Sequence, residues 1–460
     1  MTSFLITGIV ILFIAAVSVM LSSCETHEKP VETEKPFSEV VTPEWAKHAV
    51  IYEVNTRQYT PEGTFKAFSE HLPRLKDLGV DILWFMPIHP IGEKNRKGSL
   101  GSYYSIKDYT AVNPEFGTIE DFKDLVAKAH EMGFYVLLDW VANHTAWDHH
   151  WIEEHPDWYA LDEHGEMIAP YDWTDVAQLD YTNNDMQNAM IDALKFWVAE
   201  ANIDGYRCDV AGMVPTPFWE RARIELDAIK PVFMLAEDEG QHDLMHKAFD
   251  ANYGWEQHHI MNQIAKGDQN VDRLWSYFKK IDTIFPASAY RMYFTSNHDE
   301  NSWNGTVFER LGEGARAFAV LSYTIPGFPL IYNGQEAGLD HRLAFFEKDE
   351  IDWSDPNDFT SFYTKLNQIK KENKLLWNAD NGGDLDPIMI DKAQKVFAFM
   401  RSNEDEKILV FINLTNEAQT LHFADITLDG TYTCLMNNIS YSIKQNEPFE
   451  ISAWGYLVLK

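Results

Sequence analysis

Positive charge is scarce in this sequence. Lys and Arg together number 38 against 71 Asp and Glu, which gives a formal net charge of −33 at pH 7. A surface of that sign repels the phosphates of nucleic acids and the headgroups of anionic membranes. We therefore expect no nucleic acid partner, and we interpret the acidity as that of a soluble surface.

Cysteine is also rare. The chain has only Cys24, Cys208 and Cys434, at scattered positions. An odd number with this spacing excludes a disulfide framework and a cysteine-based metal cluster. Cys24 needs a separate interpretation because of the segment that precedes it.

Long apolar runs are missing except for one at residues 1–23, which carries no charged residue and is followed at once by polar sequence. Its composition is typical of a secretory signal. The segment LSSC at its end resembles a bacterial lipobox, whose cysteine is lipidated and becomes the mature N-terminus. The usual positively charged start is missing, and an uncleaved anchor is the alternative, because ~20 apolar residues can span a bilayer. We favour a lipoprotein anchored through Cys24, with its globular part outside the cytoplasm, in the periplasm or at the cell surface.

A Pro- and Glu-rich tether occupies residues 24–41, and beyond it apolar runs alternate with helical patterns. Strands that alternate with helices indicate parallel βαβ units, and eight of them predict an α/β fold of the (β/α)8 or TIM barrel type. The predicted strands lie at residues 49–54, 80–87, 134–140, 203–213, 232–237, 248–253, 291–296 and 328–334.

Two further segments complete the domain plan. A short insert rich in Trp, His and acidic residues follows the third strand, at residues 143–181. Beyond residue 380 the pattern changes to short alternating strands such as KVFAFMR and KILVFINL, which are typical of an antiparallel β domain. We expect a barrel over residues 42–380 and a C-terminal antiparallel β domain over residues 381–460 that covers the barrel and carries no site.

The segment IDGYRCDVAGM (residues 203–213) places charges in a strand that otherwise reads as core. Arg207 and Asp209 are two residues apart and therefore share one face of the strand. Desolvated charges are costly unless they pair or have a function. Each strand-end acid alone could cap a helix or form a structural ion pair, but chemistry in barrel enzymes gathers at these ends. Three more predicted strands end in acids: Asp139, Glu237 and Asp299.

Four motifs carry these acids in order along the chain. They are DWVANH (139–144), GYRCD (205–209), LAE (235–237) and SNHD (296–299). The set resembles the four signature regions of the α-amylase family of glycoside hydrolases, on strands three, four, five and seven. QLDYTNNDMQNAM (178–190) resembles a fifth region, and GFPLIYNGQEAGL resembles the family's eighth-strand segment. The resemblance extends from about residue 52 to the C-terminus.

The resemblance implies a role for each acid. Asp209 would be the nucleophile, and Arg207 would keep its carboxylate ionised because a neighbouring cation favours the charged form. Glu237 would be the general acid and base, with a raised pKa. Asp299 would grip sugar hydroxyls and stabilise the transition state. A nucleophile and an acid/base such as Asp209 and Glu237 imply a retaining double displacement, with the two carboxyl groups ~5–5.5 Å apart. Asp139 is expected to orient the site.

Four residues are expected to bind substrate. His144 and His298 match family histidines that hydrogen-bond the attacked sugar ring, and Arg207 belongs to the same group. Tyr104, in GSYYSIKDY, has the spacing of the family tyrosine that stacks on that ring, and its neighbour Tyr103 is the alternative.

Calcium is a further expectation from the resemblance. Asn143 matches a family ligand position, and Asp175 is a candidate second ligand. Calcium takes six to eight oxygen ligands, so two candidates do not make a site. The family often has Lys-His after the nucleophile, where this chain has Gly212 and Met213. Structural Ca²⁺ binding therefore stays open, and no organic cofactor is expected.

The substrate class is implied by the same resemblance. The short insert, and the lack of a domain before the first strand, favour an endo-acting α-amylase that cleaves α-1,4-glucosidic bonds in starch, glycogen or maltodextrins. A transglycosylase or an exo-α-glucosidase shares all four motifs and is the alternative. A surface-tethered glycan-binding protein is a second alternative, which would usually have lost one of the three acids; all three are present.

Overall fold

The computed structural model describes residues 36–423, 428–445 and 447–460. The predicted signal at residues 1–23, the lipidation site Cys24 and the first part of the tether lie outside these residues. Among the residues described, no helix is long and apolar enough to cross a membrane. The last predicted tether residues already contact the globular unit, because the Glu39 N–H donates to the His246 carbonyl at 2.7 Å.

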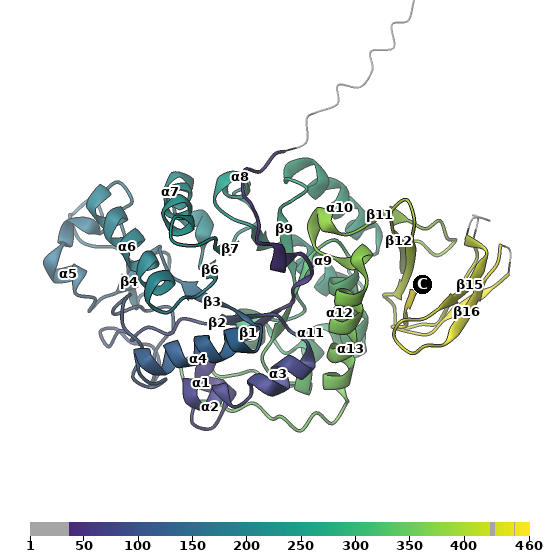
Figure 1. Cartoon of the computed structure of the whole chain (residues 1–460), viewed down its shortest axis with the longest axis horizontal. Coiled ribbons are helices and arrows are strands. Elements are labelled where there is room, and N and C mark those ends of the chain that lie inside the picture. The colour runs from purple at the N-terminus through teal and green to yellow at the C-terminus, as the bar shows by residue number, and fades with distance from the viewer. Residues whose placement is uncertain (1–35, 424–427, 446) are drawn as a thin grey trace, which may run out of the picture. The chain divides into compact units, whose positions relative to one another are not determined.

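Eight parallel strands close into a barrel, as the sequence predicted (Figure 1). The order around the barrel is β1-β10-β9-β8-β7-β6-β3-β2, and β1 pairs with β10 through Ile51 and Leu330. Both faces of these strands are buried, which explains their nearly continuous apolar sequences. The strands are β1 (Ile51–Val54), β2 (Ile82–Phe85), β3 (Tyr135–Trp140), β6 (Gly205–Cys208), β7 (Phe233–Ala236), β8 (Ala251–Tyr253), β9 (Tyr290–Tyr293) and β10 (Phe328–Tyr332).

Helices surround the barrel, and α4 shows how the sequence specifies them. Thr118 and Asp121 form a reciprocal capping box at its start, and its inner face is apolar at helical spacing. The helices are α1 (Thr56–Tyr59), α2 (Phe65–Ser69), α3 (Leu72–Leu78), α4 (Ile119–Glu131), α5 (Trp151–Glu154), α6 (Asn184–Glu200), α7 (Thr216–Asp227), α8 (Leu244–Lys247), α9 (Trp255–Lys266), α10 (Asp272–Ile284), α11 (Val307–Leu311), α12 (Ala315–Thr324) and α13 (Phe359–Glu372).

The insert after β3 contains a two-stranded antiparallel ladder. Its strands are β4 (His144–Ala146) and β5 (Val176–Gln178), with His144 opposite Gln178. The first motif therefore runs from the carboxyl end of β3 to His144, the first residue of this ladder.

The C-terminal region is antiparallel, as predicted. One face of its four-stranded sheet packs on the barrel, where α12 contacts β13, and the other face builds a core of its own. Arg401 crosses this contact and donates to the Thr324 carbonyl at 2.8 Å. The sheet consists of β11 (Asp384–Pro387), β12 (Val396–Ser402), β13 (Lys407–Asn413) and β18 (Tyr456–Leu459), and two ladders pair β14 (Gln419–Leu421) with β17 (Phe449–Ile451) and β15 (Gly430–Thr433) with β16 (Ser440–Ile443).

Gly205 is the position where β6 and β7 come closest. A Cβ added there would lie 1.8 Å from the Phe233 carbonyl oxygen, which is backbone and cannot yield. We predict that Gly205→Ala destabilises the fold by about 3 kcal/mol or more, measured by thermal and urea unfolding. The control is Gly240→Ala, where the nearest atom is 4.0 Å away. Equal melting temperatures for the two variants would contradict this reading of the barrel.

Candidate active site

The strand-end acids and Arg207 meet at one end of the barrel because neighbouring strands are in register. Asp139 on β3 pairs with Arg207 on β6, and Arg207 pairs with Leu235 on β7. Asp209 follows β6 directly, and Glu237 follows β7 directly. Asp139 and Arg207 therefore form one layer of the barrel, and Asp209 and Glu237 lie two residues further along, at its carboxyl end.

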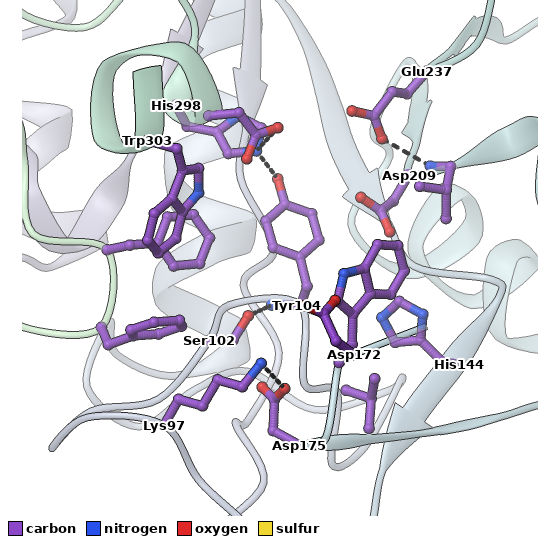
Figure 2. A pocket seen from close by; sticks show the side chains of 16 residues that line it. Lys97, Ser102, Tyr104, His144, Asp172, Asp175, Asp209, Glu237, His298 and Trp303 are labelled. Atoms are coloured by element: carbon purple, nitrogen blue, oxygen red, sulfur yellow. Dashed lines mark hydrogen bonds and ion pairs between the residues drawn. The ribbon is translucent and has the colours of Figure 1, made fainter. Parts of the chain in front are cut away.

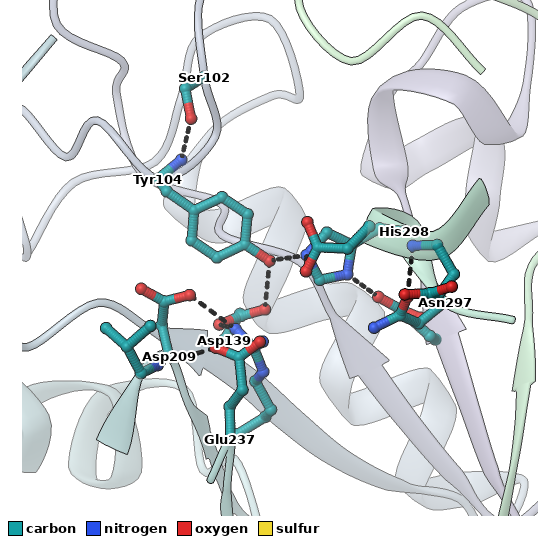
Figure 3. Close-up of polar contacts among 12 residues, drawn as sticks. Ser102, Tyr104, Asp139, Asp209, Glu237, Asn297 and His298 are labelled. Carbon is teal, nitrogen blue, oxygen red and sulfur yellow. Dashed lines mark hydrogen bonds and ion pairs between the residues drawn. The ribbon is translucent and has the colours of Figure 1, made fainter. Parts of the chain in front are cut away.

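Arg207 contacts three carboxylates at once (Figure 3). Its Nη1 lies 2.8 Å from Asp139 Oδ1 and 3.1 Å from Asp209 Oδ1, and its Nη2 lies 2.8 Å from Glu237 Oε1. The Arg207 side chain is fully buried. A planar guanidinium can bind several acceptors in fixed directions, which a lysine ammonium on a flexible stem cannot reproduce. The charges of Arg207 and Asp209 are therefore paired, and Arg207 also brings Asp139 and Glu237 close to Asp209.

Asp139 is held by more donors than its neighbours. Its Oδ2 accepts hydrogen bonds from Trp84 Nε1 and from the Tyr104 hydroxyl, both at 3.1 Å, while its Oδ1 takes Arg207. Burial raises the pKa of Asp139, and Arg207 and His298 oppose that rise. Asp139 is thus a buried carboxylate that is bonded to three donors and has no exposed oxygen.

The pKa values of Asp209 and Glu237 are both raised, mainly by burial. The Glu237 carboxylate raises the pKa of Asp209 further, and Arg207 lowers the pKa of each group. The expectation that Arg207 keeps Asp209 ionised is thus incomplete, because burial and Glu237 outweigh it. Because the Asp209 and Glu237 carboxyl groups lie close together on one guanidinium, their protonation is coupled.

Val210 supplies a second support for Glu237. Its N–H donates to Glu237 Oε2 at 2.8 Å. Val210 has φ 37°, in the left-handed region that β-branched residues rarely adopt. This strained turn directly after Asp209 aims a backbone donor at the neighbouring acid, a use of strain typical of functional sites.

His298 lies in a chain of hydrogen bonds that ends at Asp139. Its Nδ1 lies 2.5 Å from Glu53 Oε1, and its Nε2 lies 2.7 Å from the Tyr104 hydroxyl, which donates to Asp139. Burial lowers the pKa of His298, but Asp299 and Glu53 together raise it to about 9. The imidazolium is therefore the protonation state at neutral pH, and it donates through both ring nitrogens.

A cavity of about 450 Å³ opens above the carboxylates (Figure 2). The predicted residues Asp209, Glu237, Asp299, Tyr104, His144 and His298 all line it. Its size lies in the range of small-molecule sites, ~300–1,000 Å³. Tyr103, the alternative to Tyr104, is not in the lining and instead lies under the Arg57 guanidinium. Burial lowers the pKa of His144 to about 4, so this lining residue is neutral.

Several functional positions were not found from the sequence. Glu53 gave the same signal as Arg207, a lone charge in an apolar strand, and could have been found. Trp84 and Tyr253 contact Asp139 and Arg207 but look like ordinary core residues. The remaining lining residues lie mostly in loops without periodicity, apart from Val176, which begins β5. Asp175 was predicted only as a calcium ligand. The set is Lys97, Ser102, Asp172, Trp173, Asp175, Val176, Val210, Trp303, Phe345 and Phe346.

The two predicted calcium ligands do not fit one ion. Asn143 lies at one end of the β4–β5 ladder, where the Leu179 N–H donates to its carbonyl, and Asp175 precedes β5 at the other end. From Asp175 to Leu179 the strand advances ~13 Å, at ~3.3 Å per residue, whereas ligands of one Ca²⁺ each lie ~2.3–2.6 Å from it. The Asp175 carboxylate instead pairs with Lys97 at 3.0 Å. Over the described residues, no group of three His, Cys or acidic side chains could hold a metal.

A (β/α)8 barrel with buried carboxylates clustered at the carboxyl ends of its strands is the arrangement of many glycoside hydrolases. Residues 44–176 and 157–395 match the α-amylase catalytic domain, and residues 388–458 match the maltogenic amylase C-terminal domain. The chain belongs to the α-amylase family of glycoside hydrolases.

Individual relatives support this assignment. The crystal structure of an α-amylase from Lactobacillus plantarum is 31% identical with a TM-score of 0.82, over 90% of this chain and 98% of that one. A noncanonic maltogenic α-amylase from Thermotoga neapolitana is 30% identical with a TM-score of 0.81, over the same shares. The α-amylase MalA of Haloarcula japonica is 27% identical over 87% of this chain, and the match spans only 60% of that protein's length.

Glu53 gives a prediction about pH. Because folding raises the pKa of His298 from 6.5 to about 9, its charge stabilises the fold fully below pH 6.5, and this contribution is lost as the pH rises through about 9.

Glu53→Gln removes one carboxylate that raises the pKa of His298. We predict that the alkaline limb of kcat/KM moves to lower pH, measured from pH 6 to 10. Glu70→Gln, at an exposed carboxylate, is the control. An unchanged limb in Glu53→Gln would contradict the assigned charge state.

Proposed function

We propose that the protein hydrolyses α-1,4-glucosidic bonds in starch, glycogen or maltodextrins with retention of anomeric configuration. The observation that carries the proposal is the contact of one buried guanidinium with Asp139, Asp209 and Glu237 beneath a cavity. It keeps two carboxyl groups together and coupled, as a double displacement requires. The α-amylases among the relatives support the choice of an α-glucan.

In the first step Asp209 is the nucleophile. One carboxylate oxygen attacks the anomeric carbon, and the bond from that carbon to the glycosidic oxygen breaks. Glu237 donates its proton to this oxygen, so the leaving sugar departs as a neutral alcohol. The product of the step is a glycosyl ester on Asp209. As the carboxylate of Asp209 loses its charge, Arg207 stays paired with Asp139 and Glu237.

In the second step Glu237 acts as the base. Its carboxylate takes a proton from a water molecule, whose oxygen attacks the anomeric carbon and releases Asp209. Two inversions give net retention. Glu237 regains its proton and Asp209 its charge, so the free enzyme is restored with Glu237 protonated for the next cycle.

The remaining cavity residues fit the handling of the attacked ring. Asp299 lies beside the His298 imidazolium, with 3.3 Å between its Oδ2 and Nε2, and both line the cavity. The Asp299 carboxylate can accept hydrogen bonds from neighbouring sugar hydroxyls, whereas both N–H groups of the imidazolium are already bonded to Glu53 and Tyr104. Tyr104 offers an aromatic face to the ring. These contacts would strengthen as positive charge develops on the ring in the transition state.

The catalytic acids do not decide between water and a sugar as acceptor. Two curated relatives are maltosyltransferases, from Rhodospirillum rubrum and Pseudomonas aeruginosa, each 28% identical to this chain. We propose water because two solved relatives of 30% identity or more are amylases. Transfer to a sugar is the second candidate.

A product time course on maltoheptaose and soluble starch tests the proposal. We predict short α-anomeric maltooligosaccharides at early times, by chromatography and proton NMR. Asp209→Asn should lower kcat by at least ~10³-fold, because it removes the nucleophile and keeps the shape. Asp192→Asn, at an exposed position, is the control. Products longer than maltoheptaose would favour the transferase, and no turnover with binding intact would contradict the function.

A further inference from the structure

An ion pair between two loops lines one end of the catalytic cavity. Lys97 belongs to the loop between β2 and α4, and Asp175 belongs to the insert, directly before β5. Lys97 Nζ lies 3.0 Å from Asp175 Oδ1, and both side chains line the cavity. The Asp175 carbonyl also accepts from Ser105 Oγ at 3.1 Å, which fixes the backbone at that point. The pair therefore spans from one loop to the other across the cavity lining.

A second seam continues this closure on the other side of Lys97. The Ser99 N–H donates to Glu347 Oε1 at 2.8 Å, and the Leu100 N–H donates to the Phe346 carbonyl at 3.1 Å. Gly98 packs so closely that an added Cβ would lie 2.5 Å from Phe346 Cβ. The loop after β2 is thus joined both to the insert and to the loop after β10. We call residues 97–100, 345–347 and Asp175 the end wall.

An aromatic row connects the end wall to the catalytic residues. Phe345 lies nearly parallel to Tyr104, with ring centroids 6.2 Å apart and 15° between the planes. Phe346 follows at 5.2 Å from Phe345, and Trp303 contacts both. Flat apolar faces of this kind suit the faces of sugar rings. The row leads from the ring position at Tyr104 toward the end wall.

The end wall lies on the side of the cavity away from Glu237. Figure 2 shows the Lys97–Asp175 pair at one end of the pocket, Glu237 at the other, and Tyr104 between them. In the proposed mechanism Glu237 protonates the leaving oxygen, so the leaving part of the glucan extends past Glu237. The part that stays on Asp209, with the non-reducing end of the chain, extends toward the end wall.

We propose that the end wall, with Lys97 and Asp175 as its specificity-determining residues, makes the enzyme cut α-glucans from their non-reducing ends and release a short maltooligosaccharide of one length. This inference rests on the proposed function. It departs from the internal cleavage expected from the sequence, because internal cleavage needs a cleft that a chain can pass through on both sides of the broken bond. The wall leaves room for only the rings between Tyr104 and itself.

The Lys97–Asp175 pair acts through its position in the cavity, and its contribution to the stability of the fold is small. The Lys97 side chain is 35% exposed, and ion pairs of this exposure contribute little to stability. The backbone seam at Phe346 does not depend on it. Replacing Lys97 or Asp175 should therefore open the end of the cavity without unfolding the chain, which makes the pair a usable point for mutation.

Two maltoheptaose derivatives test the proposal on the wild-type enzyme. With a fluorophore on the reducing end, we predict a single labelled product at early times, shortened by a fixed number of rings. With an ethylidene cap on the non-reducing glucose, which adds bulk at the end wall, we predict a rate at least tenfold lower. Several labelled products from the first, or equal rates on capped and uncapped chains, would overturn the proposal. No hydrolysis of either would instead count against the proposed function.

Variants assign the effect to the pair. Lys97→Met and Asp175→Asn should each raise the rate on capped maltoheptaose several-fold and give more than one labelled product. Lys94→Met is the matched control, because Lys94 lies in the same loop, is exposed and does not line the cavity. Melting temperatures check that each variant is folded. A raised KM with an unchanged product pattern in both variants would make the pair a sugar contact and would contradict closure.

Discussion

The site depends on one buried cation. Arg207 is enclosed by Asp139, Asp209 and Glu237, and without it three largely buried carboxylates would face one another with no cation between them. Removing one partner of a buried ion pair typically costs ~3–5 kcal/mol, because the other charge is left uncompensated. The guanidinium thus serves stability and chemistry together: it allows the acids to be buried, and burial raises the pKa of the acid that must carry a proton. The same contacts couple the protonation of Asp209 to that of Glu237.

The rest of the site extends this arrangement outward. Asp139 accepts a hydrogen bond from the Tyr104 hydroxyl as well as from Arg207, and the Tyr104 hydroxyl is also bonded to His298 Nε2. The other ring nitrogen of His298 is bonded to Glu53. Each member comes from a different strand or loop, so the closed barrel is what brings them together. Outside this polar layer, loop residues line the cavity. They supply the aromatic row and the end wall, and in our account these loops set which part of a glucan can enter, while the polar layer performs the reaction.

The sequence predicted the fold well because barrel strands are apolar, regular and separated by helices with clear ends. It also predicted the strand-end acids, since a charge in a buried strand needs a reason, and Glu53 could have been found by the same argument. Loop residues such as Phe345 and Lys97 follow no period, and their position depends on how three loops meet. The sequence could not show that the two candidate calcium ligands, Asn143 and Asp175, lie at opposite ends of the β4–β5 ladder.

The most direct test of the central claim is the pH dependence of kcat/KM for Arg207→Lys, with melting temperatures measured alongside. Lysine keeps the charge but cannot bind three carboxylates in fixed directions. Because Arg207 lowers the pKa of both Asp209 and Glu237, the account predicts an acidic limb at higher pH than in the wild type and a fall in kcat/KM of ~10²–10³-fold. A folded variant with the acidic limb of the wild type would contradict the claim that this guanidinium sets the charge state of the catalytic pair.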